Sequence, residues 1–125
     1  MGKKILIKTG SFEQQAELNE SEAAKKIWEA LPIEGSASLW GDEIYFPIPV
    51  NSELEQPVRI VEKGDIAYWG AGDSFCIFFG PTPQSEGDEI RAASVVQVVG
   101  KLLGDPEEFK SVLDGELITL KKAED

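Results

Sequence analysis

The stretch GDIAYWGAGDSFCIFFGPTP, residues 64–83, contains two short apolar and aromatic runs. Ile66–Trp69 and Phe75–Phe79 flank the glycine-rich residues 70–73, and Gly80-Pro81 ends the second run. Short runs bounded by glycine and proline are typical of β-strands, and a four-residue link suits a compact turn. We therefore expect two adjacent strands, with the aromatic residues beside the glycine-rich turn forming one wall of a cleft.

The chain before this stretch predicts a hairpin followed by a helix. Lys4–Thr9 alternates polar and apolar residues and is expected to pair with Phe12–Leu18. Asn19 is expected to cap the helix, with Glu22 completing a capping box, and Pro32 ends it. The apolar stripe of this helix, expected to pack in the core, consists of Ala24, Ile27, Trp28 and Leu31.

The rest of the chain is rich in strand patterns. A short late helix is expected to start at Asp105-Pro106, with Glu108 closing its capping box. Its apolar residues Phe109, Val112 and Leu113 are expected to point inward. Mostly strands with one early and one short late helix predict a mainly β fold, an antiparallel barrel in a single domain over residues 1–125. The further strands are expected at Ala37–Trp40, Glu43–Ile48, Val58–Val61, Ser94–Leu103 and Leu117–Lys121.

Composition restricts the partners that the chain can bind. Its formal charge is −11, from 23 acidic and 12 basic residues. Binding to a phosphate backbone needs the opposite sign, so neither nucleic acid nor an anionic membrane is an expected partner. The apolar runs fall far short of the ~20 residues that cross a bilayer, and the N-terminal MGKKILIK lacks a signal-peptide core. We therefore expect an acidic cytoplasmic protein.

The chain has no histidine and a single cysteine, which limits its chemistry. Ser-His-Asp and Cys-His arrangements, histidine-ligated zinc and an imidazole base are all excluded. Cys76 lies in an apolar run without a neighbouring cation, so we expect a buried hydrophobic residue of little reactivity. We expect no metal ion and no cofactor.

Two blocks of the sequence resemble a known family. They are residues 39–49, LWGDEIYFPIP, and residues 64–83, and both combine Trp, Gly and Pro at fixed offsets. With the hairpin and the helix ending in Leu-Pro, they are similar to a small prokaryotic cyclophilin-like family without an assigned activity. The resemblance covers nearly the whole chain. It implies a closed eight-stranded antiparallel β-barrel covered by helices, which is the architecture of peptidyl-prolyl isomerases.

The resemblance to the isomerases themselves ends at their catalytic residues. Leu39-Trp40-Gly41 stands where these enzymes carry a catalytic arginine, and residues 89–94 lack their pocket histidine and tryptophan. That arginine stabilises the twisted amide, and losing one such donor costs on the order of 2.7–4 kcal/mol. Efficient isomerase activity is therefore not expected. Arg59 and Arg91 are the only arginines that could act as substitutes.

Aromatic residues of the two blocks are the candidates for a ligand-binding cleft. Such pockets are mostly apolar with a few placed polar groups, and a groove of this kind suits an apolar or proline-containing segment. The alternative is that several of these side chains alternate into the core. The candidate residues are Trp40, Tyr45, Phe46, Pro47, Tyr68, Trp69, Phe75 and Arg91.

Carboxylates beside glycines form a second group of candidates, namely Asp42, Glu43, Asp65 and Asp73. They could form an acidic rim for a cation or amine, or an acid/base pair. Aspartates at such turns more often accept backbone hydrogen bonds, which is the favoured interpretation. Arg91 follows an acidic loop and is expected to pair with its carboxylates, the alternative being a carboxylate ligand.

Three functions follow as alternatives. The first is a binding module that holds a small apolar or proline-containing ligand or peptide without efficient catalysis. The second is an unconventional peptidyl-prolyl cis-trans isomerase. The third, implied by the resemblance of cyclophilin-like domains to parts of larger amidohydrolase assemblies, is a subunit or partner domain of an enzyme complex.

Overall fold

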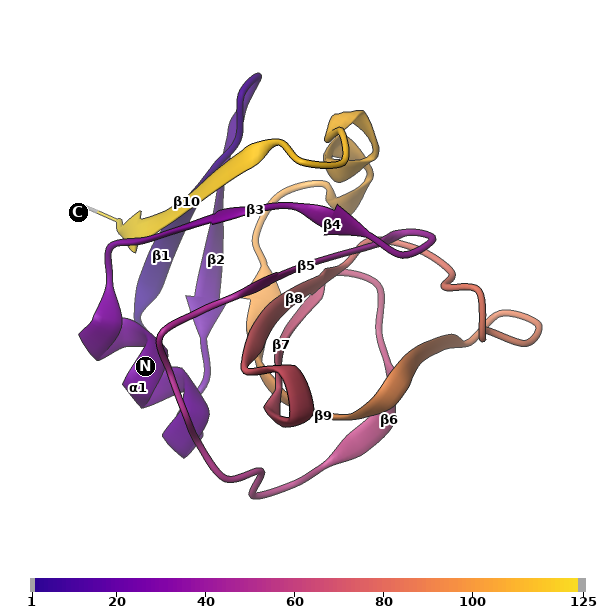
Figure 1. Ribbon diagram of the computed structural model, residues 1–125, viewed down its shortest axis with the longest axis horizontal. Coiled ribbons are helices and arrows are strands. Elements are labelled where there is room, and N and C mark those ends of the chain that lie inside the picture. The colour runs from indigo at the N-terminus through magenta and orange to yellow at the C-terminus, as the bar shows by residue number, and fades with distance from the viewer. Residues whose placement is uncertain (1, 124–125) are drawn as a thin grey trace.

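The computed structural model describes residues 2–123, a mainly β structure with a helix near each end of the sequence (Figure 1). The helices are α1 (Glu22–Ala30) and the 3₁₀ helix η2 (Pro106–Ser111), and a 3₁₀ turn, η1 (Gly70–Gly72), lies between them in the chain. No helix within residues 2–123 is both long and apolar enough to cross a membrane. The strands are β1 (Lys4–Lys8), β2 (Glu13–Leu18), β3 (Ile33–Ser36), β4 (Ser38–Leu39), β5 (Glu43–Pro47), β6 (Val58–Val61), β7 (Asp65–Trp69), β8 (Ser74–Phe78), β9 (Ile90–Leu102) and β10 (Leu117–Lys122).

The ten strands form one antiparallel arrangement that does not close into a barrel. The strand order is β3-β10-β1-β2-β9-β7-β8-β5-β4, with β6 paired to β9 beside this path. Its two ends, β3 and β4, are consecutive in the chain and meet at Ala37, whose N–H and C=O bond to Glu116 and Gly115. β3 pairs with β10 and β4 pairs with β5, so the strand changes partner at Ala37. The expected closed eight-stranded barrel is therefore wrong in closure and in strand number.

The hairpin predicted from residues 64–83 is confirmed. β7 and β8 pair antiparallel with Ile66 opposite Ile77 and Trp69 opposite Ser74, and η1 forms the connection. Asp73, which ends the turn, has a φ of 46°. The N-terminal hairpin is confirmed as well, since β1 pairs with β2 along its whole length.

Alternation along the central strands β5, β7 and β8 sends side chains to two separate cores. The larger core holds Phe46, Tyr68 and Phe75, together with Ile27 of α1 and Phe109 of η2. The helix α1, at the lower left of Figure 1, and the helix η2, at the top, thus cover the same core. The smaller core lies on the other face of the same strands, where β6 and the first half of β9 cover them. It consists of Val61, Ala67, Cys76, Phe78, Ile90, Ala92 and Val96.

Several local expectations are corrected by the structure. Ser21, not Asn19, caps α1: its hydroxyl accepts from the Ala24 N–H, and the Asn19 side chain instead binds Ser21. Asp105 caps η2 as expected, but Glu108 accepts from the Gln14 side chain rather than closing a capping box. Leu113 points outward and is 71% exposed.

Trp28 is half-buried against the larger core rather than enclosed in it. The ammonium groups of Lys3 and Lys122 lie 5.1 Å and 4.7 Å from the centre of its ring. The tryptophan therefore packs on one side and carries two cations, which its negative ring faces attract.

Candidate functional site

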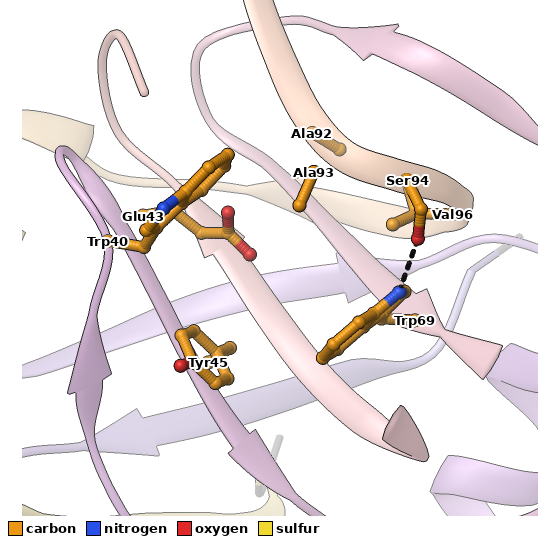
Figure 2. A pocket seen from close by; sticks show the side chains of 8 residues that line it. All are labelled: Trp40, Glu43, Tyr45, Trp69, Ala92, Ala93, Ser94 and Val96. Atoms are coloured by element: carbon orange, nitrogen blue, oxygen red, sulfur yellow. Dashed lines mark hydrogen bonds between the residues drawn. The ribbon is translucent and has the colours of Figure 1, made fainter. Parts of the chain in front are cut away.

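A small pocket opens on the outer face of the central strands, at the margin of the smaller core (Figure 2). Its volume is about 120 Å³. Most of its wall is apolar, and its side chains carry one carboxyl, that of Glu43, and two hydroxyls, those of Tyr45 and Ser94. The lining residues are Trp40, Glu43, Tyr45, Trp69, Ala92, Ala93, Ser94 and Val96.

The turn between β4 and β5 places three of these side chains together. Trp40 and Glu43 exchange two backbone hydrogen bonds across Gly41-Asp42, 2.9 Å and 3.1 Å long, so they lie directly opposite each other. Opposite residues of an antiparallel pair point to the same face, and so does Tyr45, two residues further along β5. Gly41 has a φ of +61°, a conformation that favours glycine, which lets the turn be this short.

Trp69 forms the facing wall at the end of β7. A Cβ on Gly72 would lie 2.5 Å from its ring, so only glycine lets the indole lie against the η1 turn. Its Nε1 donates to the Ser94 hydroxyl at 2.6 Å (Figure 2). The rings of Trp69 and Tyr45 meet edge to face, with centroids 6.2 Å apart and planes at 85°. These contacts hold the two rings as perpendicular walls.

An irregular segment of β9 completes the pocket. Pairing of β6 with β9 shifts register between Val58, opposite Val96, and Ile60, opposite Arg91. Such irregularities re-aim side chains, and here the residues between the two pairs, 92–95, contain three that line the pocket. Arg59 holds this segment in place, because its guanidinium donates to the carbonyls of residues 92 and 93 at 3.1 Å and 2.8 Å.

Glu43 is the polar group of this pocket with the most unusual environment. It is 6% exposed, and burial raises its pKa to about 7. A hydrogen bond from the Cys76 thiol partly offsets this increase. Burial and the neighbouring Glu43 raise the pKa of the thiol well above its ordinary value, so Cys76 stays protonated as a donor. The carboxyl therefore changes charge near neutral pH while facing an apolar pocket.

The structure divides the eight predicted cleft residues into three groups. Trp40, Tyr45 and Trp69 come together in the pocket. Pro47 is exposed at the end of β5, and Arg91 binds Glu89 through its Nε at 2.7 Å, as its acidic neighbours predicted; neither lines the pocket. The other three, each 0% exposed in the larger core, are Phe46, Tyr68 and Phe75.

The fold uses the side chains of two of the three candidate aspartates, Asp65 and Asp73, while the carboxyl of Asp42 lies beside Gly80. Asp65 accepts from the Glu62 N–H at 2.8 Å and pairs with Lys101 at 3.1 Å. Asp73 accepts from the Tyr68 hydroxyl at 2.7 Å and from the side chain of Asn51. Within residues 2–123, no three acidic or cysteine side chains are grouped to hold a metal ion.

The pocket residues that the sequence does not indicate are those of β9. Arg59, which supports them, is indicated by the sequence only as a possible substitute for the catalytic arginine. Ala92, Ala93 and Ser94 are small and unremarkable in sequence, and they reach the pocket through the pairing of β9 with β6 and β7. The sequence places Glu43 in a group of carboxylates that could form an acidic rim or an acid/base pair. Its place on the face of Tyr45 could have been found from the period-two alternation along β5.

Comparison with known proteins agrees with this structure. A family model described as cyclophilin-like matches residues 3–121. The chain belongs to the cyclophilin-like family. This cyclophilin-like chain is also similar to a hypothetical protein from Archaeoglobus fulgidus of known solution structure, with 40% sequence identity and a TM-score of 0.82 over 98% of this chain and 95% of that one. Among curated proteins, no sequence matches. The resemblance inferred from the two sequence blocks is therefore confirmed. It shows the family of the chain and does not assign an activity to it.

Proposed function

We propose that this cyclophilin-like domain is a binding module whose pocket takes one compact apolar group, such as a proline ring, from a small molecule or a peptide. The observation that carries the proposal is the meeting of Trp40, Tyr45 and Trp69 around a cavity of about 120 Å³. An apolar cavity of ~150 Å³ holds a benzene molecule, so a pocket of this size suits a single ring. Concave, mainly aromatic walls with a few placed polar groups are typical of ligand sites.

The two arginines favour binding without rapid catalysis. Prolyl isomerisation needs a donor that stabilises the twisted amide. The Arg59 guanidinium is bound to Gln84 and to two carbonyls of β9, and the Arg91 guanidinium is bound to Glu89. Neither side chain lines the pocket. The Ser94 hydroxyl remains as a donor toward a ligand carbonyl, and it is neutral.

Tryptophan fluorescence tests the binding function directly. A Trp28→Phe variant removes the tryptophan outside the pocket, so the signal then comes from Trp40 and Trp69. Titration with N-acetylproline amide and with an Ala-Pro tetrapeptide should give a saturable change with a Kd of about 1 mM or lower. Adding Trp40→Leu should weaken this binding at least about tenfold, because one wall of the pocket is lost. No saturable change with either probe would contradict the proposal.

The same peptide separates binding from catalysis. NMR exchange measurements on the Ala-Pro tetrapeptide report its cis/trans rate with and without the protein. A binding module leaves this rate unchanged at concentrations where fluorescence shows saturation. A faster rate that is lost in Arg59→Ala or Arg91→Ala would favour the isomerase alternative instead.

A further inference from the structure

We propose that the pocket selects compact groups that carry a positive charge, namely alkylammonium groups such as a choline head group or a methylated lysine side chain. This inference rests on the proposed binding function and names its ligand class. Tyr45 and Trp69 form two perpendicular walls, Trp40 forms a third, and the Glu43 carboxyl points between the two indoles (Figure 2). Aromatic rings around one acidic group form the environment that an organic cation requires.

The ring faces supply the first part of the attraction. A cation within about 6 Å of a ring centroid is attracted to the negative face, most strongly to tryptophan, and more so where water is excluded. The pocket offers two tryptophans and a tyrosine. A methylated ammonium also suits its apolar wall better than a lysine ammonium, because the methyl groups contact the rings while the charge is spread beneath them.

The carboxyl supplies the second part. Only 6% of the Glu43 surface is exposed, and a carboxylate that is buried so deeply is stabilised by an opposite charge beside it. Among residues 2–123, no lysine or arginine lines the pocket. Trp28 differs from the pocket tryptophans, because the ammonium groups of Lys3 and Lys122 lie over its ring. The chain thus provides cations for Trp28, while the pocket with the buried acid receives its cation from a ligand.

The charge state of Glu43 makes this binding depend on pH. The ionisable groups that face it are the Cys76 thiol on β8 and the Tyr45 phenol on β5, while the β9 wall contributes alanine, serine and valine. Asp42, next in the turn, has its carboxyl beside Gly80. The pKa of Glu43, about 7, means that the carboxylate predominates at pH 8 and the neutral acid at pH 6. Cation affinity should therefore rise about tenfold from pH 6 to pH 8.

Choline and its uncharged carbon analogue, 3,3-dimethylbutan-1-ol, have nearly the same shape and test the inference in the Trp28→Phe background. At pH 8 we expect the affinity for choline to be at least about tenfold higher than the affinity for the alcohol. The Glu43→Gln variant should lose most of the preference for choline and the pH dependence of that preference, and it should still bind the alcohol. Glu34→Gln, which removes one exposed acid from β3, is the matched control and should leave the preference unchanged. A tetrapeptide with trimethyllysine, run beside choline, shows whether a peptide-borne or a free ammonium is preferred.

The outcomes separate this inference from the function on which it rests. Equal or weaker binding of choline relative to the alcohol at pH 8 overturns the selection of cations and leaves the binding pocket intact. Binding of the proline probes without binding of choline or of the trimethyllysine peptide also overturns the selection of cations and leaves the binding pocket intact. Failure of all probes overturns the binding module itself. If Glu34→Gln lowers the choline preference as much as Glu43→Gln does, general negative charge is the cause and the inference is wrong.

Discussion

The two faces of the β5–β8–β7 sheet differ in what they enclose. On the inner face, Phe46, Tyr68 and Phe75 are all 0% exposed. On the outer face, Ala67 and Phe78 are buried too, but the sheet end that carries Tyr45 and Trp69 remains open. The same three strands therefore build a filled core on one side and a pocket on the other. What differs is the cover, because β6 and an irregular part of β9 do not fill the outer side completely.

Truncating an inner-face ring should have the largest effect on stability. Phe75 packs on Phe46 with ring centroids 5.6 Å apart and has no exposed surface. Phe75→Ala should lower the free energy of unfolding by about 3–5 kcal/mol in urea titrations, since transfer and cavity terms add. Trp40→Ala on the pocket side should lower it by less than half as much. Equal losses for the two variants would show that the outer face is as tightly packed as the inner one.

Glu43→Gln should change the pH dependence of stability. Because the folded state raises the pKa of Glu43 from 4.5 to about 7, the folded chain holds this proton more tightly than the unfolded chain. Glu43 contributes fully to the free energy of unfolding below about pH 4.5, and this contribution is lost as the pH rises through 7. The free energy of unfolding should therefore fall by about 3 kcal/mol over this range. Urea titrations should find the variant more stable than the parent at pH 8 and close to it at pH 4.5. A constant difference between the two proteins across this range would place the pKa of Glu43 near its ordinary value.

The contrast between the faces also explains what the sequence could predict. The strand pair β7–β8 follows from local signals, since two apolar runs and a glycine-rich turn lie within 20 residues. The predicted cleft group combines residues of both faces, because most of its members share a type, aromatic or proline, and not a face of the sheet. Strict alternation would have separated Tyr45 from Phe46 and Trp69 from Tyr68.

Features that depend on distant pairing could not be found in the same way. The change of partner at Ala37 requires β10, about 80 residues later in the chain. The β9 wall consists of residues with small side chains that carry no signal by themselves. The raised pKa of Glu43 results from its burial, to which that wall contributes. The sequence therefore predicts an exposed rim carboxylate where the structure has a buried one.

Tyr68→Phe removes the polar end of an inner-face ring. The Tyr68 hydroxyl shares its one proton between Asp73 at 2.7 Å and the Val50 carbonyl at 3.1 Å, and it accepts from the Ser52 N–H at 3.2 Å. Its loss removes the hydrogen bonds that the Val50 carbonyl and the Ser52 N–H make to it and leaves Asp73 with the bond from Asn51, and it should cost about 1–3 kcal/mol of unfolding free energy. Hydrogen exchange at the Ser52 amide should become faster. Tyr45→Phe, at the half-exposed outer position, should change stability by less than about 0.5 kcal/mol, and a larger loss there would contradict the comparison.

Ser94→Ala should affect stability less than the inner-face substitutions do and should have a clear effect on the pocket. The Ser94 hydroxyl is the acceptor for the Trp69 indole at 2.6 Å, and this bond fixes one aromatic wall. Because the site is half-open to water, the loss should be about 0.5–1.5 kcal/mol. The Trp69 indole N–H should exchange faster with solvent and shift in NMR spectra, and choline should bind more weakly. Ser94→Thr keeps the hydroxyl and should preserve both properties. Unchanged indole exchange in Ser94→Ala would mean that packing on Gly72 alone orients Trp69, and that the outer face is held as firmly as the inner one without this hydrogen bond.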